Sequence, residues 1–142
     1  MVDIQDFMAA CLNMTEQELA DYAWERYKPV RDYLEPKYGI KDTDDMVFDA
    51  LSTICAIDGN LTDGEYEILR NIHGFCYAEQ KDIERRVKRH NNQRDIQKTV
   101  NFGKSLPYDE RLSFICLAIA ILAVDSRYTD NELALLHQLL RI

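Results

Sequence analysis

The sequence predicts an all-α protein that forms a single compact domain of six or seven helices. Apolar residues recur at spacings of three and four along nearly the whole chain, which is the period of an amphipathic helix. No stretch of four or more residues alternates convincingly between apolar and polar, so no strand is predicted. Only five Gly and three Pro occur among 142 residues, which leaves little room for linkers. A chain of this length can bury one sizeable core.

The first 40 residues are predicted to form an N-terminal helical arm. Thr15 and Glu18 have the spacing of a capping box, in which each residue hydrogen-bonds the backbone N–H of the other at the start of a helix. The helix that follows should run to about Tyr38. Because proline has no N–H to donate, Pro29 should kink or interrupt this helix, and Pro36 should lie at or near its end.

Five further helical patterns follow along the chain. Apolar spacing predicts helices over about Met46–Cys55 and Tyr66–Cys76, and the charged stretch from about Glu79 to Phe102 is predicted to be a long, mostly exposed helix. Pro107–Val124 should be an apolar helix with its proline in the first turn, where no N–H is needed. A last helix should begin at Asp130.

Charge is distributed unevenly along the chain. Residues 1–79 carry 17 acidic and 6 basic side chains, whereas residues 80–142 carry 8 acidic and 11 basic ones. The basic excess lies in Ile83–Arg94, which is read as a solvated helix face or as a surface that docks against an acidic patch. With an acidic balance overall and no nucleic-acid motif, no nucleic-acid partner is expected.

The chain is expected to be cytoplasmic and not to insert directly into a membrane. Its first residues are acidic rather than basic and apolar, unlike a signal peptide. The longest nearly apolar run, Leu112–Val124, has 13 residues and is too short to span a bilayer.

Catalysis is not expected, and the protein is predicted not to be an enzyme. The three His residues lie outside any metal-ligand spacing, and there is no Gly-rich phosphate loop. The four cysteines lie in apolar segments without a C-x-x-C pair, so they are read as reduced core thiols: Cys11, Cys55, Cys76 and Cys116.

One acidic segment occurs twice in the sequence. AIDGNLTDGEYEIL at residues 56–69 and AVDSRYTDNELALL at residues 123–136 match at a constant offset of 67. Each copy is predicted to be a helix, an acidic turn and a second helix, and the two hairpins should pack pseudo-symmetrically around one core. Thr62 with Glu65, and Thr129 with Glu132, each fit the capping box.

Four carboxylates of this repeat are candidate metal ligands. Helical spacing places Asp58 and Asp125 on the apolar faces of the helices that precede the turns. Glu65 and Glu132 precede apolar residues of the following helices at the same spacing. All four carboxylates are therefore predicted to lie at the inward edge of their helices. Buried carboxylates need donors, a cation or a proton. The four could converge on one hard divalent cation, Ca²⁺ or Mg²⁺. Alternatively, backbone N–H groups and a nearby Arg satisfy each carboxylate separately.

An EF-hand does not explain the turn. Counted from Asp58, the sixth position holds Asp63 instead of Gly and the twelfth holds Leu69 instead of Glu. In the second copy, Arg127 stands at the third position, where an oxygen ligand is required.

The doubled motif resembles that of the tellurite-resistance TerB-like family. The resemblance rests on AIDGNLTDGE and AVDSRYTDNE and covers roughly residues 44–142. It implies an all-helical domain with an acidic, metal-binding site at Asp58, Glu65, Asp125 and Glu132, and a stress-response context. The second copy departs from the family pattern at Ser126 and Arg127, and Arg127 could act as an internal countercharge.

Two hypotheses of function follow from the sequence. In the first, the chain is a small helical binding module whose doubled acidic turn holds a divalent cation. In the second, it is a structural or protein-interaction domain whose acidic turns are only helix caps. In that case an unidentified protein partner would dock on the tyrosine-rich N-terminal segment or on the basic helix.

Overall fold

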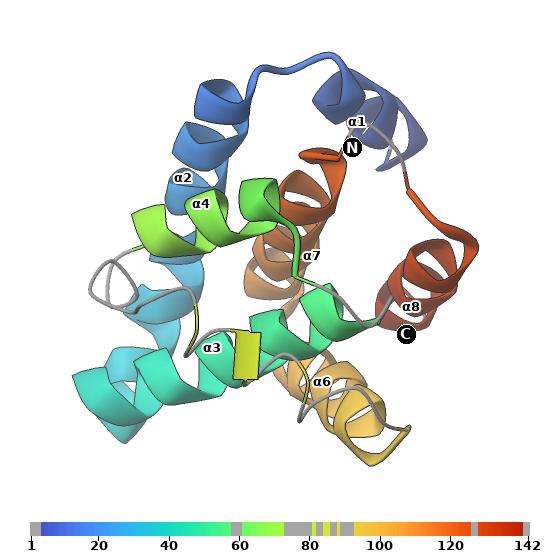
Figure 1. Cartoon of the computed structure of the whole chain (residues 1–142). Helices are drawn as coiled ribbons and strands as arrows, with labels where there is room; N and C mark the ends of the chain where they lie inside the picture. The colour runs from blue at the N-terminus through green and yellow to red at the C-terminus, as the bar shows by residue number, and fades with distance from the viewer. Residues whose placement is uncertain are drawn as a thin grey trace.

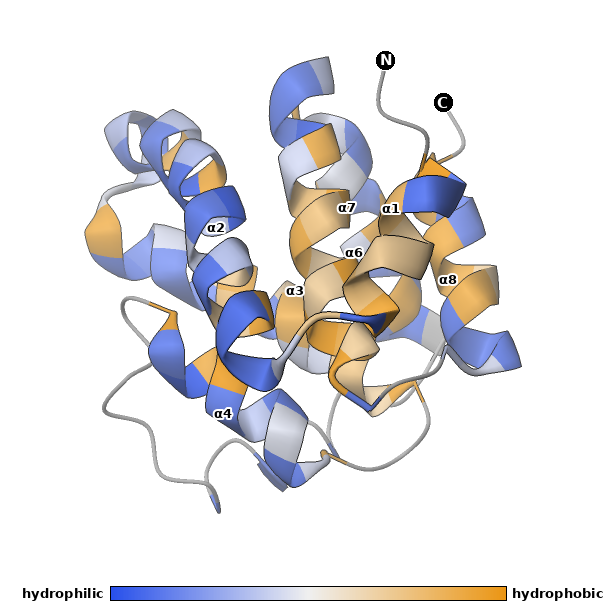
Figure 2. Ribbon diagram, turned by 90° about the horizontal axis from the view of Figure 1, so that it is seen from above, coloured by the Kyte–Doolittle hydropathy of each residue, from blue (hydrophilic) through white to orange (hydrophobic). Residues whose placement is uncertain are grey.

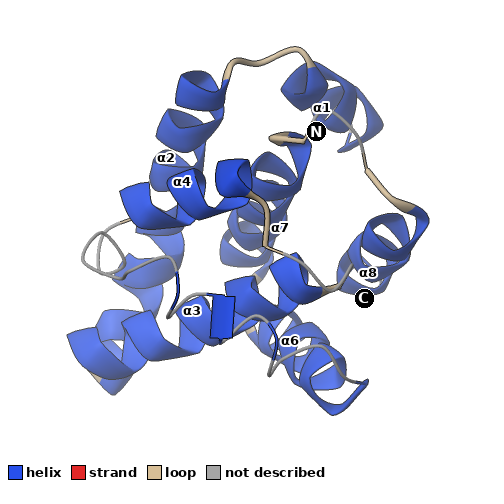
Figure 3. Ribbon diagram, in the orientation of Figure 1, coloured by secondary structure: helices blue, strands red, loops and turns tan. Residues whose placement is uncertain are grey.

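A computed structural model shows an all-α single domain (Figure 1). It describes residues 4–57, 61–72, 81, 84–85, 88, 93–125 and 128–140. Figure 3 shows helices and loops, and no strand, within these ranges. The described helices are α1 (Ile4–Leu12), α2 (Glu16–Tyr38), α3 (Ile40–Ala56), α4 (Asp63–Asn71), α6 (Gln93–Ser105), α7 (Tyr108–Ala123) and α8 (Asp130–Leu140).

Helix α7 forms the centre of the domain. All residues from Ser113 to Ala123 are buried, and α7 contacts every other described helix: α1, α2, α3, α4, α6 and α8. In Figure 2 its ribbon is largely orange, while the surrounding helices carry blue residues on their outer sides. A helix that is apolar on all sides is stable only when other helices cover it, so α7 sets the position of the rest.

The N-terminal segment is part of the same core. Helix α2 packs extensively along α7 and buries an apolar stripe that includes Leu19, Ala23, Tyr27 and Val30. The hydroxyl of Tyr27 donates a hydrogen bond to the carboxylate of Asp44 in α3. Removing this segment would therefore expose one long side of α7.

The predicted start and end of α2 are confirmed, but the predicted interruption at Pro29 is wrong. Thr15 and Glu18 form the capping box, with N–H to oxygen distances of 3.0 and 3.1 Å. The helix ends at Tyr38, two residues beyond Pro36. It continues through Pro29 because both Pro29 and Glu25, whose carbonyl has lost its N–H donor, face solvent, where water can bond the carbonyl.

The remaining helices follow the sequence pattern with small shifts at their ends. Helix α3 includes the predicted Met46–Cys55 segment, α4 ends at Asn71, and α8 begins at Asp130 as predicted. Pro107 lies one residue before α7 rather than inside it. Part of the predicted Glu79–Phe102 helix and Cys76 lie outside the described residues, and α6 extends to Ser105.

None of the helices in the described residues is long and apolar enough to cross a membrane.

Candidate site at the paired acidic turns

The two hairpins have the same local geometry where their first helices, α3 and α7, end. The N–H of Ile57 bonds the carbonyl of Ile54 at 3.4 Å as α3 ends, and the N–H of Val124 bonds the carbonyl of Ile121 at 3.4 Å as α7 ends. These pairs are related by the offset of 67 found in the sequence. The repeated sequence therefore produces a repeated structure.

Both predicted capping boxes at the turns are confirmed. The N–H of Thr62 donates to Glu65 Oε1 at 3.0 Å, and the N–H of Glu65 donates to Thr62 Oγ1 at 3.1 Å. In the second copy the N–H of Thr129 donates to Glu132 Oε1 at 2.8 Å, and the N–H of Glu132 donates to Thr129 Oγ1 at 3.3 Å. Each glutamate thus caps the start of its helix by accepting a hydrogen bond from a backbone N–H that would otherwise lack a partner.

The turn of the first hairpin contacts the turn of the second. Thr62 Oγ1 donates to Asp125 Oδ2 at 3.3 Å. A Cβ atom placed on Gly64 would lie 2.9 Å from Cγ2 of Val124, so the first turn of α4 packs closely against the end of α7. We call the group of Thr62, Glu65, Asp125 and Glu132 the acidic junction.

Two of the carboxylates in the acidic junction are buried. Glu65 is 2% exposed and Glu132 is 5% exposed. The pKa of Glu65 is raised to about 7, mainly by burial and in smaller part by the carboxylates of Asp125 and Glu132, while hydrogen bonds with Thr62 oppose the rise. A group with this pKa exchanges its proton near neutral pH, so the charge of the acidic junction varies there.

Cys55 is a neighbour of this group that sequence reasoning did not assign to it. Its thiol is fully buried, and burial raises its pKa well above the ordinary value, with further contributions from Glu65, Glu132 and Asp125. It therefore lies beside the carboxylates as a protonated thiol at neutral pH. Its place in the last turn of the apolar helix that leads into the first acidic turn was the available signal.

The structure brings together three of the four predicted ligands. Glu65 and Glu132 are buried as predicted, but the prediction that Asp125 points inward is wrong, because its side chain is exposed. Helix α7 ends at Ala123, so helical spacing no longer applies at Asp125. Asp58 and Arg127 lie outside the described residues. Among the residues that are described, no group of three or more His, Cys, Asp or Glu side chains is arranged to hold a metal ion.

Known proteins give no further guide to this site. A scan against protein-family models finds no matching family, and searches of curated proteins and of solved structures find no match to this chain. The resemblance to the TerB-like family stays a prediction from the sequence motif.

Proposed function

We propose that the chain is a small helical binding module of TerB-like type whose acidic junction takes up a divalent cation, Ca²⁺ or Mg²⁺, in a stress-response setting. The observation that carries this proposal is that two buried glutamates from separate hairpins, Glu65 and Glu132, share one junction with Asp125, where burial and, to a lesser extent, the two neighbouring carboxylates raise the pKa of Glu65 to about 7. A divalent cation would replace the proton and offset the repulsion among the carboxylates.

The ligand chemistry supports a hard cation. The acidic junction offers carboxylate oxygens, which Ca²⁺ and Mg²⁺ prefer. A cap does not use up a carboxylate, since each has two oxygens and about four acceptor sites. Glu65 and Glu132 would bind through oxygen while still capping their helices. Asp125 would bind from the rim, and Asp58, at the turn of the first hairpin, would complete the set.

A second candidate function is favoured by the completeness of the caps. Both glutamates already accept backbone N–H groups at 2.8–3.0 Å, so the turns are stabilised without any ion. In this case the chain is a structural or interaction domain. Tyr27 of the tyrosine-rich N-terminal helix is then unavailable to a partner, because it is fully buried. Tyr38 and Ile40, which are 52% and 64% exposed, would offer the contact instead.

Thermal unfolding distinguishes the two functions. The full chain is melted at pH 7.5 in EDTA and in millimolar Ca²⁺, Mg²⁺ or Mn²⁺. A specific cation at about 100 times its dissociation constant should add roughly 2.7 kcal/mol to the free energy of unfolding. Asp58→Asn and Asp125→Asn should each reduce that gain. Asp109→Asn, an exposed first-turn acid of α7, removes the same charge away from the acidic junction and should leave it unchanged.

The opposite result supports the second function. If no cation changes the melting temperature of the wild type beyond its effect on Asp58→Asn and Asp125→Asn, the turns are caps only and the cation proposal fails.

A further inference from the structure

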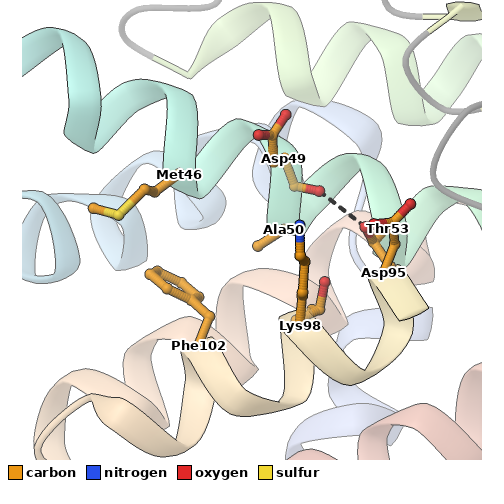
Figure 4. A pocket seen from close by; sticks show the side chains of 8 residues that line it. Met46, Asp49, Ala50, Thr53, Asp95, Lys98 and Phe102 are labelled. Carbon is orange, nitrogen blue, oxygen red and sulfur yellow. Dashed lines mark hydrogen bonds between the residues drawn. The ribbon is translucent and has the colours of Figure 1, made fainter. Parts of the chain in front are cut away.

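A cavity of about 210 Å³ lies between α3 and α6, away from the acidic junction. Figure 4 shows the hydroxyl of Thr53 donating a hydrogen bond to the backbone carbonyl of Asp49, at 3.0 Å. Both Asp49 and Asp95 make further interactions. None of the described lining residues has a buried side-chain N or O atom without a hydrogen-bond partner. The cavity therefore leaves no buried polar group for a ligand to satisfy.

Reactive side chains meet instead where α1 packs on α7. Helix α1 buries two side chains, Met8 and Cys11, and α7 is its main helix partner in the described structure. Cys11 is 0% exposed, so its thiol lies inside this contact. Cys116 of α7 is 8% exposed, and both cysteines are free thiols.

A tyrosine of α2 joins the two thiols. The thiols of Cys11 and Cys116 interact with each other, and the hydroxyl of Tyr22 hydrogen-bonds the sulfur of Cys116 and interacts with Cys11 as well. The ring of Tyr22 contacts Phe7 of α1, with centroids 5.1 Å apart, and the guanidinium of Arg26, which lies 4.9 Å from its centroid. We call the group of Cys11, Tyr22 and Cys116 the thiol cluster, since three helices bring its members together.

Both thiols are protected while α1 is in place. Burial and, to a lesser extent, the neighbouring Cys116 raise the pKa of Cys11 to about 11. Burial also raises the pKa of Cys116, although Tyr22 and Arg26 oppose this rise. Because the thiolate is the reactive form, neither buried thiol reacts readily at neutral pH.

Helix α1 is able to open locally. It has nine residues, and a helix of that length is not stable by itself in water. Its docking depends on the contact with α7 and on the hydroxyl of Tyr128, which donates to the carbonyl of Met8 at 2.8 Å. Local opening of such an element costs less free energy than global unfolding. Opening takes Cys11 out of the core and uncovers Cys116 in the same movement.

We propose that Cys11 and Cys116 form a reversible disulfide that locks α1 onto α7 when the protein meets a hydroperoxide. While α1 is open, one thiolate attacks the O–O bond of the peroxide, which gives a sulfenic acid and releases water or an alcohol. When α1 closes, the second thiol attacks the sulfenic sulfur, the S–S bond forms and water leaves. The two thiols are oxidised to one disulfide and the peroxide is reduced, and a dithiol reductant reverses the change.

The test is oxidation of the reduced full chain with hydrogen peroxide at low protein concentration. The remaining thiols are alkylated, and the peptides are mapped by mass spectrometry without reduction. The expected product is a monomer in which the peptides that carry Cys11 and Cys116 are joined, and dithiothreitol should restore both thiols. The disulfide closes a loop of about 100 residues in the unfolded chain, so the oxidised monomer should melt at a higher temperature than the reduced one.

Cysteine variants assign the link. Cys11→Ala and Cys116→Ala should each abolish the joined peptides and the rise in melting temperature. Cys55→Ala removes a buried thiol of α3 outside the thiol cluster and should form the link at the rate of the wild type.

A tyrosine variant tests the opening of α1. Tyr128→Phe removes the hydrogen bond to the Met8 carbonyl, so α1 should open more often and the link should form severalfold faster. Tyr108→Phe, which changes a tyrosine that is 57% exposed, should leave the rate unchanged.

Three results would overturn the proposal. The first is a treated monomer in which Cys11 and Cys116 stay free or are oxidised singly. The second is a linked monomer that melts no higher than the reduced one, which would mean that the bond does not lock the folded position of α1. The third is an equal rate of linkage in Tyr128→Phe and the wild type, which would exclude opening of α1 as the route.

Discussion

Gly64→Ala tests whether the two acidic turns pack as closely as the structure shows. A Cβ at this position would lie 2.9 and 3.1 Å from the two γ-carbons of Val124. Valine has a stiff χ1 angle and cannot easily rotate away. The added methyl must therefore push α4 from the end of α7.

Two opposing effects determine the size of the change. Alanine in place of glycine within a helix gains about 0.5–1 kcal/mol. Overpacking by one methyl group costs about 1–3 kcal/mol. We expect the second effect to dominate, so that the variant loses roughly 0.5–2 kcal/mol of unfolding free energy, which lowers the melting temperature by roughly 2–6 °C.

The sequence repeat supplies the control. Asn131 occupies the position equivalent to Gly64 in the second copy and is exposed. Asn131→Ala should therefore stay within about 0.5 kcal/mol of the wild type. Urea unfolding followed by circular dichroism measures both variants. If Gly64→Ala is as stable as the wild type or more stable, the close contact between α4 and Val124 does not exist and the acidic junction is looser than described.

Three further predictions concern Glu65 of the acidic junction and two positions elsewhere in the domain. The pKa of Glu65 is about 7 in the folded chain and near 4.5 in the unfolded chain, so between these pH values the folded state binds the proton more tightly. The free energy of unfolding should therefore fall by up to about 3 kcal/mol as the pH rises from about 4.5 to above 7. Glu65→Gln keeps the capping geometry, and its urea midpoint should change less with pH over that range. If the urea midpoint of the variant depends on pH as strongly as that of the wild type, Glu65 is not the group that titrates. Tyr128→Phe removes the 2.8 Å hydrogen bond to the Met8 carbonyl and should cost about 1–2 kcal/mol in urea unfolding, whereas no loss would mean that water replaces the hydroxyl. Pro29→Ala restores the N–H that can bond the Glu25 carbonyl and should raise the melting temperature, and a lower one would show that proline stabilises α2 by restricting the unfolded chain.

The ends of the helices at the repeat were predictable because capping is local. Thr62 and Glu65 are three residues apart, and their hydrogen bonds depend only on the first turn of one helix. The same holds for Thr129 and Glu132. The offset of 67 likewise predicted two similar hairpins, because similar sequences have similar local preferences.

The position of Asp125 could not be predicted by the same reasoning. Helical spacing assigns a face only while the helix continues, and α7 ends two residues before Asp125. The hydrogen bond from Thr62 to Asp125 joins residues 63 positions apart, so it depends on how the hairpins pack. The interruption predicted at Pro29 was wrong for a related reason, because the cost of a proline depends on whether water reaches the carbonyl that loses its donor.

The sequence by itself determined the all-α class, the capped helix starts and the doubled acidic turn, since these depend on residues within a few turns of one another. The tertiary structure decided which of these residues meet. It placed the N-terminal helix against α7, buried Glu65 and Glu132 in one junction, and left a cavity between α3 and α6. Such long-range contacts follow from the way apolar faces fit together, and the periodicity of any single helix does not contain that information.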